Sequence, residues 1–365
     1  MIVSRGNSVA KIVHRYEHRE HTPAREIDVR GTIHVNLVWR GDSAMKSFGI
    51  DGDTMDLVPR EVPEPTLKPD AVLVKMRAVA LNRGEFVAGY GLHAPGSVKT
   101  AGYEGAGEII AVGVNVKGLS IGDRVFGRAD AAFAEIASMQ AGEVNRIPAS
   151  FDWQTAAGAG ITYITAYDSL IVEGLCVPGD WALIPAASSG VGVAAIQICR
   201  ALGFKSFGTT GSVAKLGRLK SIGMDAGVPS RAPTFASQVR DATGGRGAKV
   251  SVNNVGGTVV TESLRSLCYR GTLVIVGYVD RMVMPEMDLL AVHINRLRII
   301  GVSQKLRSPA ERAETTQGFR EVVLPHMVSG AIRPVVDRVF DFKELPAAKR
   351  FMETDGHIGK IVAVL

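Results

Sequence analysis

Cysteine is scarce in this chain of 365 residues, which contains three: Cys176, Cys199 and Cys268. They lie far apart in the sequence and form no Cys-x-x-Cys pair, the spacing that marks many zinc sites and redox centres. This scarcity excludes a disulfide framework and a zinc site built from clustered cysteines. We therefore expect three small, buried thiols in a reducing compartment, which favours the cytoplasm.

Long apolar runs are also absent, and no segment is both long enough and apolar enough to span a bilayer. The chain is 46% hydrophobic and 21% charged, as globular proteins are, and its length predicts two domains. The formal net charge of +6 comes from scattered Lys and Arg residues that are not interleaved with aromatic residues. A solvated basic surface is therefore expected, rather than a nucleic-acid site.

A sustained hydrophobic period is missing from residues 1–44, which hold half of the eight histidines. Val35–Trp39 has the composition of a short strand, but no partner strand is evident nearby. His14 and His18 would share a helix face, yet no fourth ligand follows, so we predict no metal site there. Interspersed acidic residues argue against a transit peptide. We expect residues 1–44 to be a disordered or artefactual extension and Met45 to be a natural start.

The most informative stretch is residues 180–203, whose pattern predicts a strand, a tight turn and a helix. Trp181–Ile184 suits a buried parallel strand, and apolar residues then recur at helical spacing up to Gly203. Ala187 and Ala195 stand at the outer two places of the usual three-glycine fingerprint. Between them, small residues would let backbone N–H groups and the positive end of the helix approach a pyrophosphate: Ser188, Ser189, Gly190 and Gly192. The alternative is that small residues serve only helix-to-strand packing.

No acidic residue ends the next predicted strand, Phe204–Thr210, where an NAD enzyme places an Asp or Glu on the ribose hydroxyls. Hydroxyl groups and cations stand there instead: Thr209, Thr210, Ser212, Lys215 and Arg218. Such donors can hold a 2′-phosphate, which a carboxylate would repel. The sequence therefore favours NADPH over NADH. The alternative is that Lys215 and Arg218 form an ordinary solvated helix face.

Short strands punctuated by Gly and Pro are predicted between residue 45 and Pro148, a pattern typical of a small β-barrel. We expect them at residues 56–62, 72–81, 107–113, 123–127 and 132–138. After Pro148 the hydrophobic period changes from two to about 3.6, which predicts helix up to the nucleotide turn. Later parallel strands are expected at residues 249–252, 272–277 and 297–302, followed by a helix at 345–352 and a final strand at 361–365.

Five motifs, in this order, resemble the medium-chain dehydrogenase/reductase superfamily: Gly102–Glu108, Gly122–Val125, Tyr163–Tyr167, Ala187–Gly192 and His357–Val362. Within that superfamily the chain resembles the zinc-free quinone oxidoreductase branch, from Met45 to Leu365. The resemblance implies an α/β fold with a GroES-like β-barrel domain plus a Rossmann doubly wound parallel-sheet domain. It implies a catalytic barrel at residues 45–164 and 307–365, an NADP-binding domain at 165–306 and an active site in the cleft between them.

The resemblance also bears on metal chemistry. Metal-bearing branches use a Cys and a His on the barrel as zinc ligands; here Tyr103 stands at the His position, and the Cys position falls within Leu81–Glu85. Without a Lewis acid an alcohol is difficult to ionise at neutral pH. The implied activity is hydride transfer from NADPH to quinones or α,β-unsaturated carbonyls. The alternatives are an NADPH-dependent aldehyde or ketone reductase, and an NADPH-binding protein that acts through partner or RNA binding.

By resemblance, the site residues contact either the substrate or a part of the cofactor. Thr165 would contact the nicotinamide, and Asn82 would orient the substrate carbonyl by a hydrogen bond. The remaining cofactor contacts would be Ser188, Gly190, Val191 and Gly192 at the pyrophosphate, Thr210, Ser212 and Lys215 at the adenosine phosphate, and Gly277, Tyr278 and Lys360 on the other side. The candidate proton donors are Tyr103, Tyr163 and Tyr278, with water or the cofactor ribose as alternatives.

Several positions depart from the family pattern. Gly84 and Glu85 stand where relatives often have an aspartate after Leu-Asn-Arg, and Arg83 replaces a tyrosine of some enoyl reductases. Asn253 stands where Asp is common. Ser230 replaces a tyrosine near the adenine, which leaves Arg231 as a substitute for binding phosphate. A homodimer is implied through the Rossmann sheet edge near Thr272–Val276, and the apolar Met282–Leu290 suits either that interface or the core.

Overall fold

The computed structural model describes residues 24–27, 33–36, 44–87, 98–230 and 232–365. Strands β1 (Ala24–Ile27) and β2 (Ile33–Asn36) form an antiparallel pair, with Ala24 opposite Asn36. The expectation that a strand near Val35 would have no partner was therefore wrong, because a four-residue partner that is half charged gives no hydrophobic pattern. The histidines at 14 and 18 and the phosphate-binding candidate at 231 lie outside the described residues.

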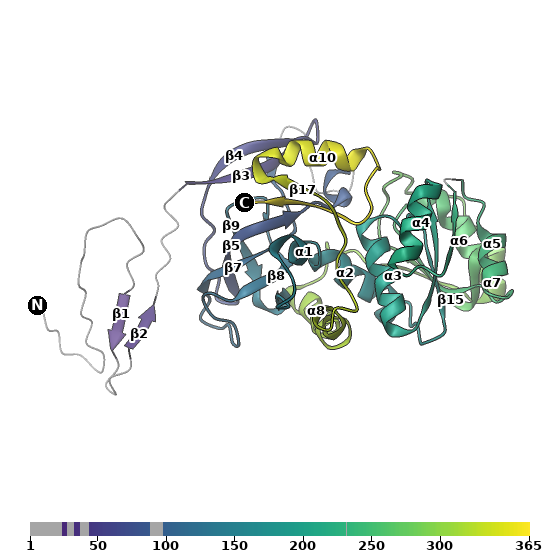
Figure 1. Cartoon of the computed structure of the whole chain (residues 1–365), viewed down its shortest axis with the longest axis horizontal. Helices are drawn as coiled ribbons and strands as arrows, with labels where there is room; N and C mark the ends of the chain where they lie inside the picture. The colour runs from purple at the N-terminus through teal and green to yellow at the C-terminus, as the bar shows by residue number, and fades with distance from the viewer. Residues whose placement is uncertain (1–23, 28–32, 37–43, 88–97, 231) are drawn as a thin grey trace, which may run out of the picture.

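The barrel domain combines strands from both ends of the chain (Figure 1). Its larger sheet has the order β10-β8-β7-β5-β18-β17, β9 pairs with β5, and a smaller sheet has the order β4-β3-β6. The strands are β3 (Ala44–Asp51), β4 (Leu57–Pro63), β5 (Ala71–Ala80), β6 (Val98–Thr100), β7 (Glu104–Val112), β8 (Arg124–Arg128), β9 (Ile136–Gln140), β10 (Val144–Arg146), β17 (Val336–Asp341) and β18 (Lys360–Val364). Because β18 pairs with β5, the chain's last segment lies beside residues 78–80 of the barrel.

The second domain is a six-stranded parallel sheet of order β13-β12-β11-β14-β15-β16. Its strands are β11 (Trp181–Ile184), β12 (Lys205–Thr210), β13 (Ala226–Pro229), β14 (Ala248–Asn253), β15 (Leu267–Ile275) and β16 (Arg298–Gly301). Its helices are α3 (Gly190–Leu202), α4 (Val213–Ile222), α5 (Ala236–Ala242), α6 (Val260–Ser266) and α7 (Leu289–Asn295). The strand order reverses beside β11, where doubly wound sheets bind their ligands. The predicted barrel and Rossmann architecture is confirmed.

One strand of this sheet escaped sequence prediction. β13 reads Ala-Gly-Val-Pro and is exposed or half-buried throughout, so it carries neither an apolar run nor an alternation. Gly277 therefore follows the fifth strand of the sheet in chain order, whereas the sequence pattern placed it after the fourth.

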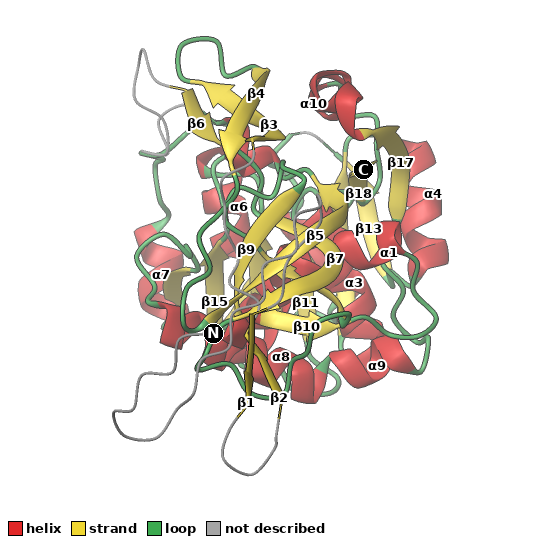
Figure 2. Cartoon of the chain, turned by 90° about the vertical axis from the view of Figure 1, so that its left-hand side faces the viewer, coloured by secondary structure: helices red, strands yellow, loops and turns green. Residues whose placement is uncertain are grey.

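Helices α1 (Trp153–Ala157), α2 (Gly160–Tyr167), α8 (Pro309–Val322), α9 (Leu324–Val328) and α10 (Leu345–Glu353) connect and cover the two domains (Figures 1 and 2). One hydrophobic core contains residues of both, including Phe126 of the barrel, Tyr163 of α2 and Val252 of the parallel sheet. The domains are thus joined by continuous apolar packing. No helix within the described ranges is long and apolar enough to cross a bilayer.

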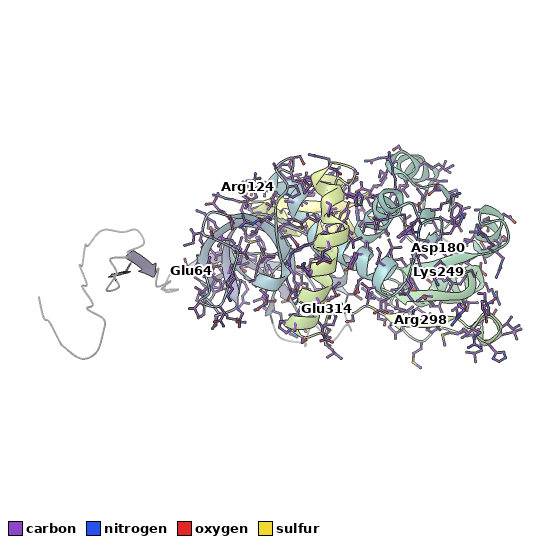
Figure 3. The ribbon with its side chains drawn as sticks, turned by 90° about the horizontal axis from the view of Figure 1, so that it is seen from below. Glu64, Arg124, Asp180, Lys249, Arg298 and Glu314 are labelled. Carbon is purple, nitrogen blue, oxygen red and sulfur yellow. The ribbon has the colours of Figure 1, made fainter. Side chains whose placement is uncertain are left out.

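The amino-terminal edge of the parallel sheet is marked by charged residues. Asp180 precedes β11, Lys249 lies at the start of β14 and Arg298 begins β16. Figure 3 labels these three side chains on the Rossmann domain, while Glu64 and Arg124 mark the barrel. Since the strands are parallel, their carboxyl ends share the opposite edge, where the turn before α3 meets the segment that leads into β18.

Candidate cofactor cleft and active site

The predicted phosphate turn lies between β11 and α3. Ser189 caps the helix, and its side chain accepts a hydrogen bond from the Gly192 N–H at 3.1 Å. A Cβ on Gly192 would lie 2.6 Å from the Ala187 carbonyl oxygen, so the turn itself requires glycine. The first N–H groups of this 13-residue helix have no partner inside the helix and, with its positive end, form a ready anion site.

Gly190 is required for a different reason. A Cβ there would lie 2.8 Å from Lys360 Cδ and 3.0 Å from Thr162 Cγ2, so the glycine lets the barrel's last strand approach the start of α3. The Gly359 N–H also donates to the Ser188 carbonyl at 2.9 Å. Ser188, Gly190, Val191 and Gly192 are therefore brought together where the two domains touch.

Two buried polar atoms at the carboxyl edge of the sheet have no hydrogen-bond partner within the described part of the chain. They are Thr210 Oγ1 at the end of β12 and Asn254 Oδ1 just after β14. Both strands are neighbours of β11 in the sheet. Leaving a buried polar atom unpaired costs about 1–3 kcal/mol, so such atoms usually receive a bond from a ligand or water. Their placement on either side of the phosphate turn fits a dinucleotide.

The hydroxyl and ammonium groups predicted to recognise the adenosine phosphate meet at the start of α4. Ser212 caps this helix, accepting from the Lys215 N–H at 3.2 Å. The Lys215 ammonium donates to the His357 carbonyl at 2.9 Å and to the Asp355 carbonyl. Lys215 therefore reaches across the cleft to the segment before β18, a placement that helical spacing alone did not predict.

Lys360 differs from its predicted position beside the cofactor. Its ammonium is buried and donates to Glu104 Oε1 at 2.5 Å, Asn82 Oδ1 at 2.8 Å and the Leu81 carbonyl at 2.8 Å. These three bonds use all of its protons. Its stem borders Gly190, but its charge faces the barrel interior.

Asn82 belongs to the same network. Its amide nitrogen donates to Glu85 Oε1 at 3.1 Å and to Glu104 Oε1 at 3.0 Å, while its oxygen accepts from Lys360. An Asn side chain has two amide hydrogens, and both are used here. This geometry leaves no donor for a substrate carbonyl, so it supports a positioning role for Asn82 rather than the predicted contact.

Glu85 is the functional candidate that sequence reasoning missed. Its carboxylate is buried, and its second oxygen accepts from the Gly102 N–H at 3.0 Å. Burial raises the pKa of Glu85 to about 7, against the lowering effects of the Asn82 hydrogen bond and the Lys360 charge. Glu104, also buried, accepts from the Ile161 N–H at 2.6 Å and so ties β7 to α2. The signal in the sequence was an acidic residue directly before the apolar Phe86 and Val87.

The three candidate tyrosines lie in different surroundings. Tyr103 is half-buried, and burial raises its pKa, as does the nearby Glu85 charge. Tyr163 is buried in the core, where its hydroxyl donates to Gln197 Oε1 at 2.6 Å and burial raises its pKa. That placement supports a packing role for Tyr163. Tyr278 lies after β15 and is 36% exposed.

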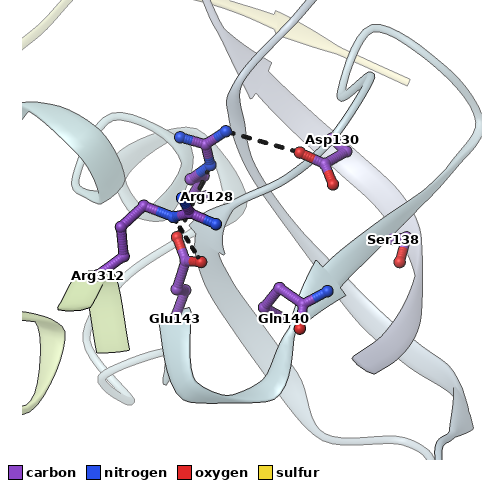
Figure 4. Close-up of a pocket in the computed structure, with 6 residues that line it drawn as sticks. All are labelled: Arg128, Asp130, Ser138, Gln140, Glu143 and Arg312. Atoms are coloured by element: carbon purple, nitrogen blue, oxygen red, sulfur yellow. Dashed lines mark hydrogen bonds and ion pairs between the residues drawn. The ribbon is translucent and has the colours of Figure 1, made fainter. Parts of the chain in front are cut away.

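The arginine that lies over the Tyr103 ring is itself held by acidic side chains. Arg128 Cζ lies 5.6 Å from the centre of the Tyr103 ring. Its guanidinium is held by Asp130 and by the buried Glu143, each at 3.7 Å, and Glu143 also binds Arg312 of α8 at 2.9 Å (Figure 4). These ion pairs fix Arg128, whose cation–π contact then helps to orient the Tyr103 ring.

The other sequence candidates are placed as follows. Thr165 is buried on α2, and its carbonyl accepts from the Ser169 hydroxyl at 2.8 Å. Cys176 and Cys199 are buried, as expected, but Cys268 is half-buried. Among the described residues, no group of three or more His, Cys, Asp or Glu side chains is arranged to hold a metal ion.

Two family models match the chain. The model described as alcohol dehydrogenase GroES-like domain matches residues 68–178, and the one described as zinc-binding dehydrogenase matches residues 190–316. Together they cover the barrel strands β5–β10 and the strands β12–β16 of the parallel sheet.

The curated relatives are much longer proteins, and this chain aligns with one segment of each. The chain is 30% identical over 316 residues to a fungal highly reducing polyketide synthase, and 32% identical over 305 residues to the mycoketide-CoA synthase of Mycobacterium tuberculosis. These alignments cover 86% and 82% of this chain but only 12% and 7% of the relatives.

Solved structures match over nearly their whole length. A mycobacterial protein complexed with NADPH has a TM-score of 0.77 and 26% identity, with 88% of this chain and 100% of that chain covered. A mycobacterial quinone oxidoreductase has a TM-score of 0.74 and 25% identity, with the same coverage. The CurK enoyl reductase has a TM-score of 0.73 and 25% identity, covering 88% of this chain and 98% of that one.

Proposed function

Because the chain belongs to the medium-chain dehydrogenase/reductase superfamily, we propose that it is a zinc-independent NADPH-dependent oxidoreductase acting on quinones or α,β-unsaturated carbonyls. The observation that carries the proposal is the end of β12. There the Thr210 hydroxyl is buried without a partner in the described chain, and the Lys215 ammonium follows on α4 with no acidic residue between them. These groups fit a phosphorylated adenosine and offer nothing that repels it.

The chain's own residues then have distinct tasks. The N–H groups at the start of α3 would hold the pyrophosphate, and Thr210, Ser212 and Lys215 would hold the 2′-phosphate. Thr165 would contact the nicotinamide, and Gly277 and Tyr278 would contact the cofactor from the other side. When bound, NADPH supplies the hydride. Quinones and α,β-unsaturated carbonyls are electrophilic enough to accept it without a metal ion.

On the barrel side, Tyr103 is the residue we assign to proton donation. It stands at the family's zinc-ligand histidine position, it is half-exposed, and Arg128 orients its ring. Asn82 acts through the Glu85, Glu104 and Lys360 network as a positioning residue. The aldehyde or ketone reductase reading remains the alternative within the superfamily, and binding without turnover is the alternative outside it.

We also propose a homodimer. In the parallel sheet β15 is an inner strand, so an edge-to-edge contact would run through β16. Apolar side chains in the segment between β15 and β16 are exposed, among them Met284 at 88%, Leu289 at 68% and Leu290 at 66%. Patches of this kind mark interfaces. Sedimentation of the purified protein tests the dimer, and a monomer at micromolar concentration would contradict it. The cytoplasm stays our expected compartment.

Titration of cofactor fluorescence tests the cofactor assignment. We expect NADPH to bind at least tenfold more tightly than NADH, and Lys215→Met to remove that preference, since a charge-assisted hydrogen bond contributes roughly 1.5–3 kcal/mol. Lys220→Met, in the last turn of the same helix, is the matched control and should change neither affinity. Equal binding of both cofactors by the unaltered protein would contradict the assignment.

A substrate panel tests the reaction. Oxidation of NADPH by quinones or enones, with slower or no oxidation by simple aldehydes and ketones, is the expected result. Preference for simple aldehydes and ketones would favour the alternative reductase. If none of these acceptors is reduced, the binding role is favoured. Tyr103→Phe should lower kcat on enones more than it changes the NADPH affinity.

A further inference from the structure

The turn between α10 and β18, residues 354–359, is held by contacts from both domains. On the Rossmann side, Lys215 donates to the carbonyls of Asp355 and His357. On the barrel side, the guanidinium of Arg83 binds Asp355 Oδ1 at 2.7 Å and donates to the Met352 carbonyl. The turn therefore occupies the ammonium group that we assign to the adenosine 2′-phosphate.

We propose that Arg83 and Asp355 are specificity-determining residues, which hold this turn on Lys215 so that the turn and the 2′-phosphate of NADPH compete for one ammonium. The inference rests on the proposed function, since it assumes that Lys215 binds the phosphate. It adds that the affinity for NADPH, but not for NADH, is set by how firmly the barrel domain holds its own turn.

The geometry of the turn favours competition. Asp355 has a φ of 57°, in the left-handed region that non-glycine residues rarely adopt, so the ion pair with Arg83 holds a conformation that is unfavourable by itself. His357 Nδ1 is buried with no hydrogen-bond partner in the described residues. Both features lower the net stability of the fastened turn, so a strong competitor can displace it.

The surrounding charge supports the same conclusion. Burial, together with the charges of Arg83 and Lys215, lowers the pKa of His357 to about 4, so its imidazole is neutral near pH 7. Two fixed cations therefore face this turn from opposite domains. The Lys215 ammonium now binds neutral carbonyl groups, whereas a phosphate would add the attraction between two opposite charges to the hydrogen bond.

The consequence for cofactor choice follows from population arithmetic. If the turn occupies Lys215 in most molecules, the apparent Kd for NADPH is raised by the inverse of the remaining fraction. NADH lacks the phosphate and makes no demand on Lys215, so its affinity does not depend on the turn. Loosening the turn should therefore strengthen NADPH binding selectively.

Asp355→Asn is the variant that tests this inference. Asparagine tolerates the left-handed conformation but removes the charge that pairs with Arg83. We expect NADPH to bind roughly threefold to tenfold more tightly, and NADH to bind within about twofold of the unaltered protein. Glu353→Gln is the matched control. It removes the same charge two residues away, where Glu353 pairs with Lys349 at 2.9 Å and not with Arg83 or Lys215. The control should leave both affinities within about twofold.

Hydrogen exchange gives a readout that does not depend on turnover. NADPH should increase amide exchange at residues 354–358 of the unaltered protein, while NADH should not. Unchanged or slower exchange with NADPH, together with unchanged NADPH affinity in Asp355→Asn, would overturn the inference. An equal gain in Glu353→Gln would also overturn it, since net charge would then explain the effect.

Lys215→Met separates this failure from failure of the proposed function. If that variant loses the preference for NADPH while Asp355→Asn behaves as the unaltered protein, then Lys215 binds the phosphate and the turn between α10 and β18 does not affect NADPH binding. If Lys215→Met retains full NADPH affinity, the assignment of the phosphate site itself is wrong.

Discussion

Lys360 and Lys215 both connect the end of the chain to the cofactor cleft, but they do so in different surroundings. At the domain junction the Lys360 ammonium is 4% exposed and bound by the buried carboxylate of Glu104 at 2.5 Å. At the rim of the cleft the Lys215 ammonium binds backbone carbonyls of a turn. The same residue type is therefore a fixed structural charge in one place and, in our proposal, an exchangeable ligand contact in the other.

The difference teaches where cofactor specificity can be adjusted. Removing one partner of a buried ion pair leaves the other charge buried without a counter-charge. Substitutions of Lys360 or Glu104 at the junction should therefore lower stability. A contact between an ammonium and carbonyl groups at the rim can be broken and remade at little cost, because water can reach both partners. Substitutions at the junction should change stability, and substitutions at the rim should change binding.

The largest effect is expected from Lys360→Met. This change leaves the buried Glu104 and Glu85 carboxylates without their cation, which should lower the free energy of unfolding by about 3–5 kcal/mol. Urea denaturation measures it. Lys220→Met, on the exposed face of α4, is the control and should change stability by less than about 0.5 kcal/mol. If the Lys360→Met protein is as stable as the original, the Lys360 ion pair contributes as little to stability as a solvent-accessible contact does.

A smaller loss is expected from Gly190→Ala, which pushes a methyl group into the junction. The new Cβ would lie 2.8 Å from Lys360 Cδ, so Lys360 or α3 must shift, at about 1–3 kcal/mol of unfolding free energy. Gly217→Ala on α4 is the matched control because no atom lies within 4 Å of its Cβ position. That control should stabilise the helix by roughly 0.5–1 kcal/mol. Equal effects would contradict tight packing at the junction.

Glu85→Gln tests the junction by pH. The pKa of Glu85 is raised by burial to about 7, above its ordinary value of 4.5, so the folded protein holds this proton more tightly than the unfolded chain does. Stability from this group is present below pH 4.5 and is lost as the pH rises to 7, by roughly 1–3 kcal/mol. Relative to the unaltered protein, Glu85→Gln should therefore gain stability across this window in thermal unfolding. Parallel pH profiles would show that Glu85 does not titrate there.

His357→Gln should give a pH effect of opposite sign at the rim. The pKa of His357 is lowered by burial to about 4, below its ordinary 6.5, so its contribution is present above pH 6.5 and is lost as the pH falls to 4. The variant should gain relative stability on acidification, by an amount smaller than that of Glu85→Gln because the imidazole is less buried. A constant offset from lost packing is expected at every pH, and only the slope decides the outcome.

Much of the fold could be predicted from local patterns. Trp181–Ile184 is a strand with the predicted bounds, and Gly203 ends α3 in a left-handed conformation, because a buried strand and a helix end each leave a local sequence signal. β13 left no such signal and was missed. At the site, the small residues of the phosphate turn and the hydroxyl groups after β12 were found because their spacing from a strand is fixed by the turn that follows it.

The sequence by itself determined most of the strands and helices, the anion-binding turn and the absence of a carboxylate at the end of β12, since each depends on neighbours within about twenty residues. Tertiary structure alone decided what the charged side chains contact. Lys360 meets Glu104 across 256 positions and Lys215 meets His357 across 142, and nothing in local spacing encodes such contacts. A long, flexible side chain takes the partner that the packed domains bring to it, so its role is fixed only when the two domains come together.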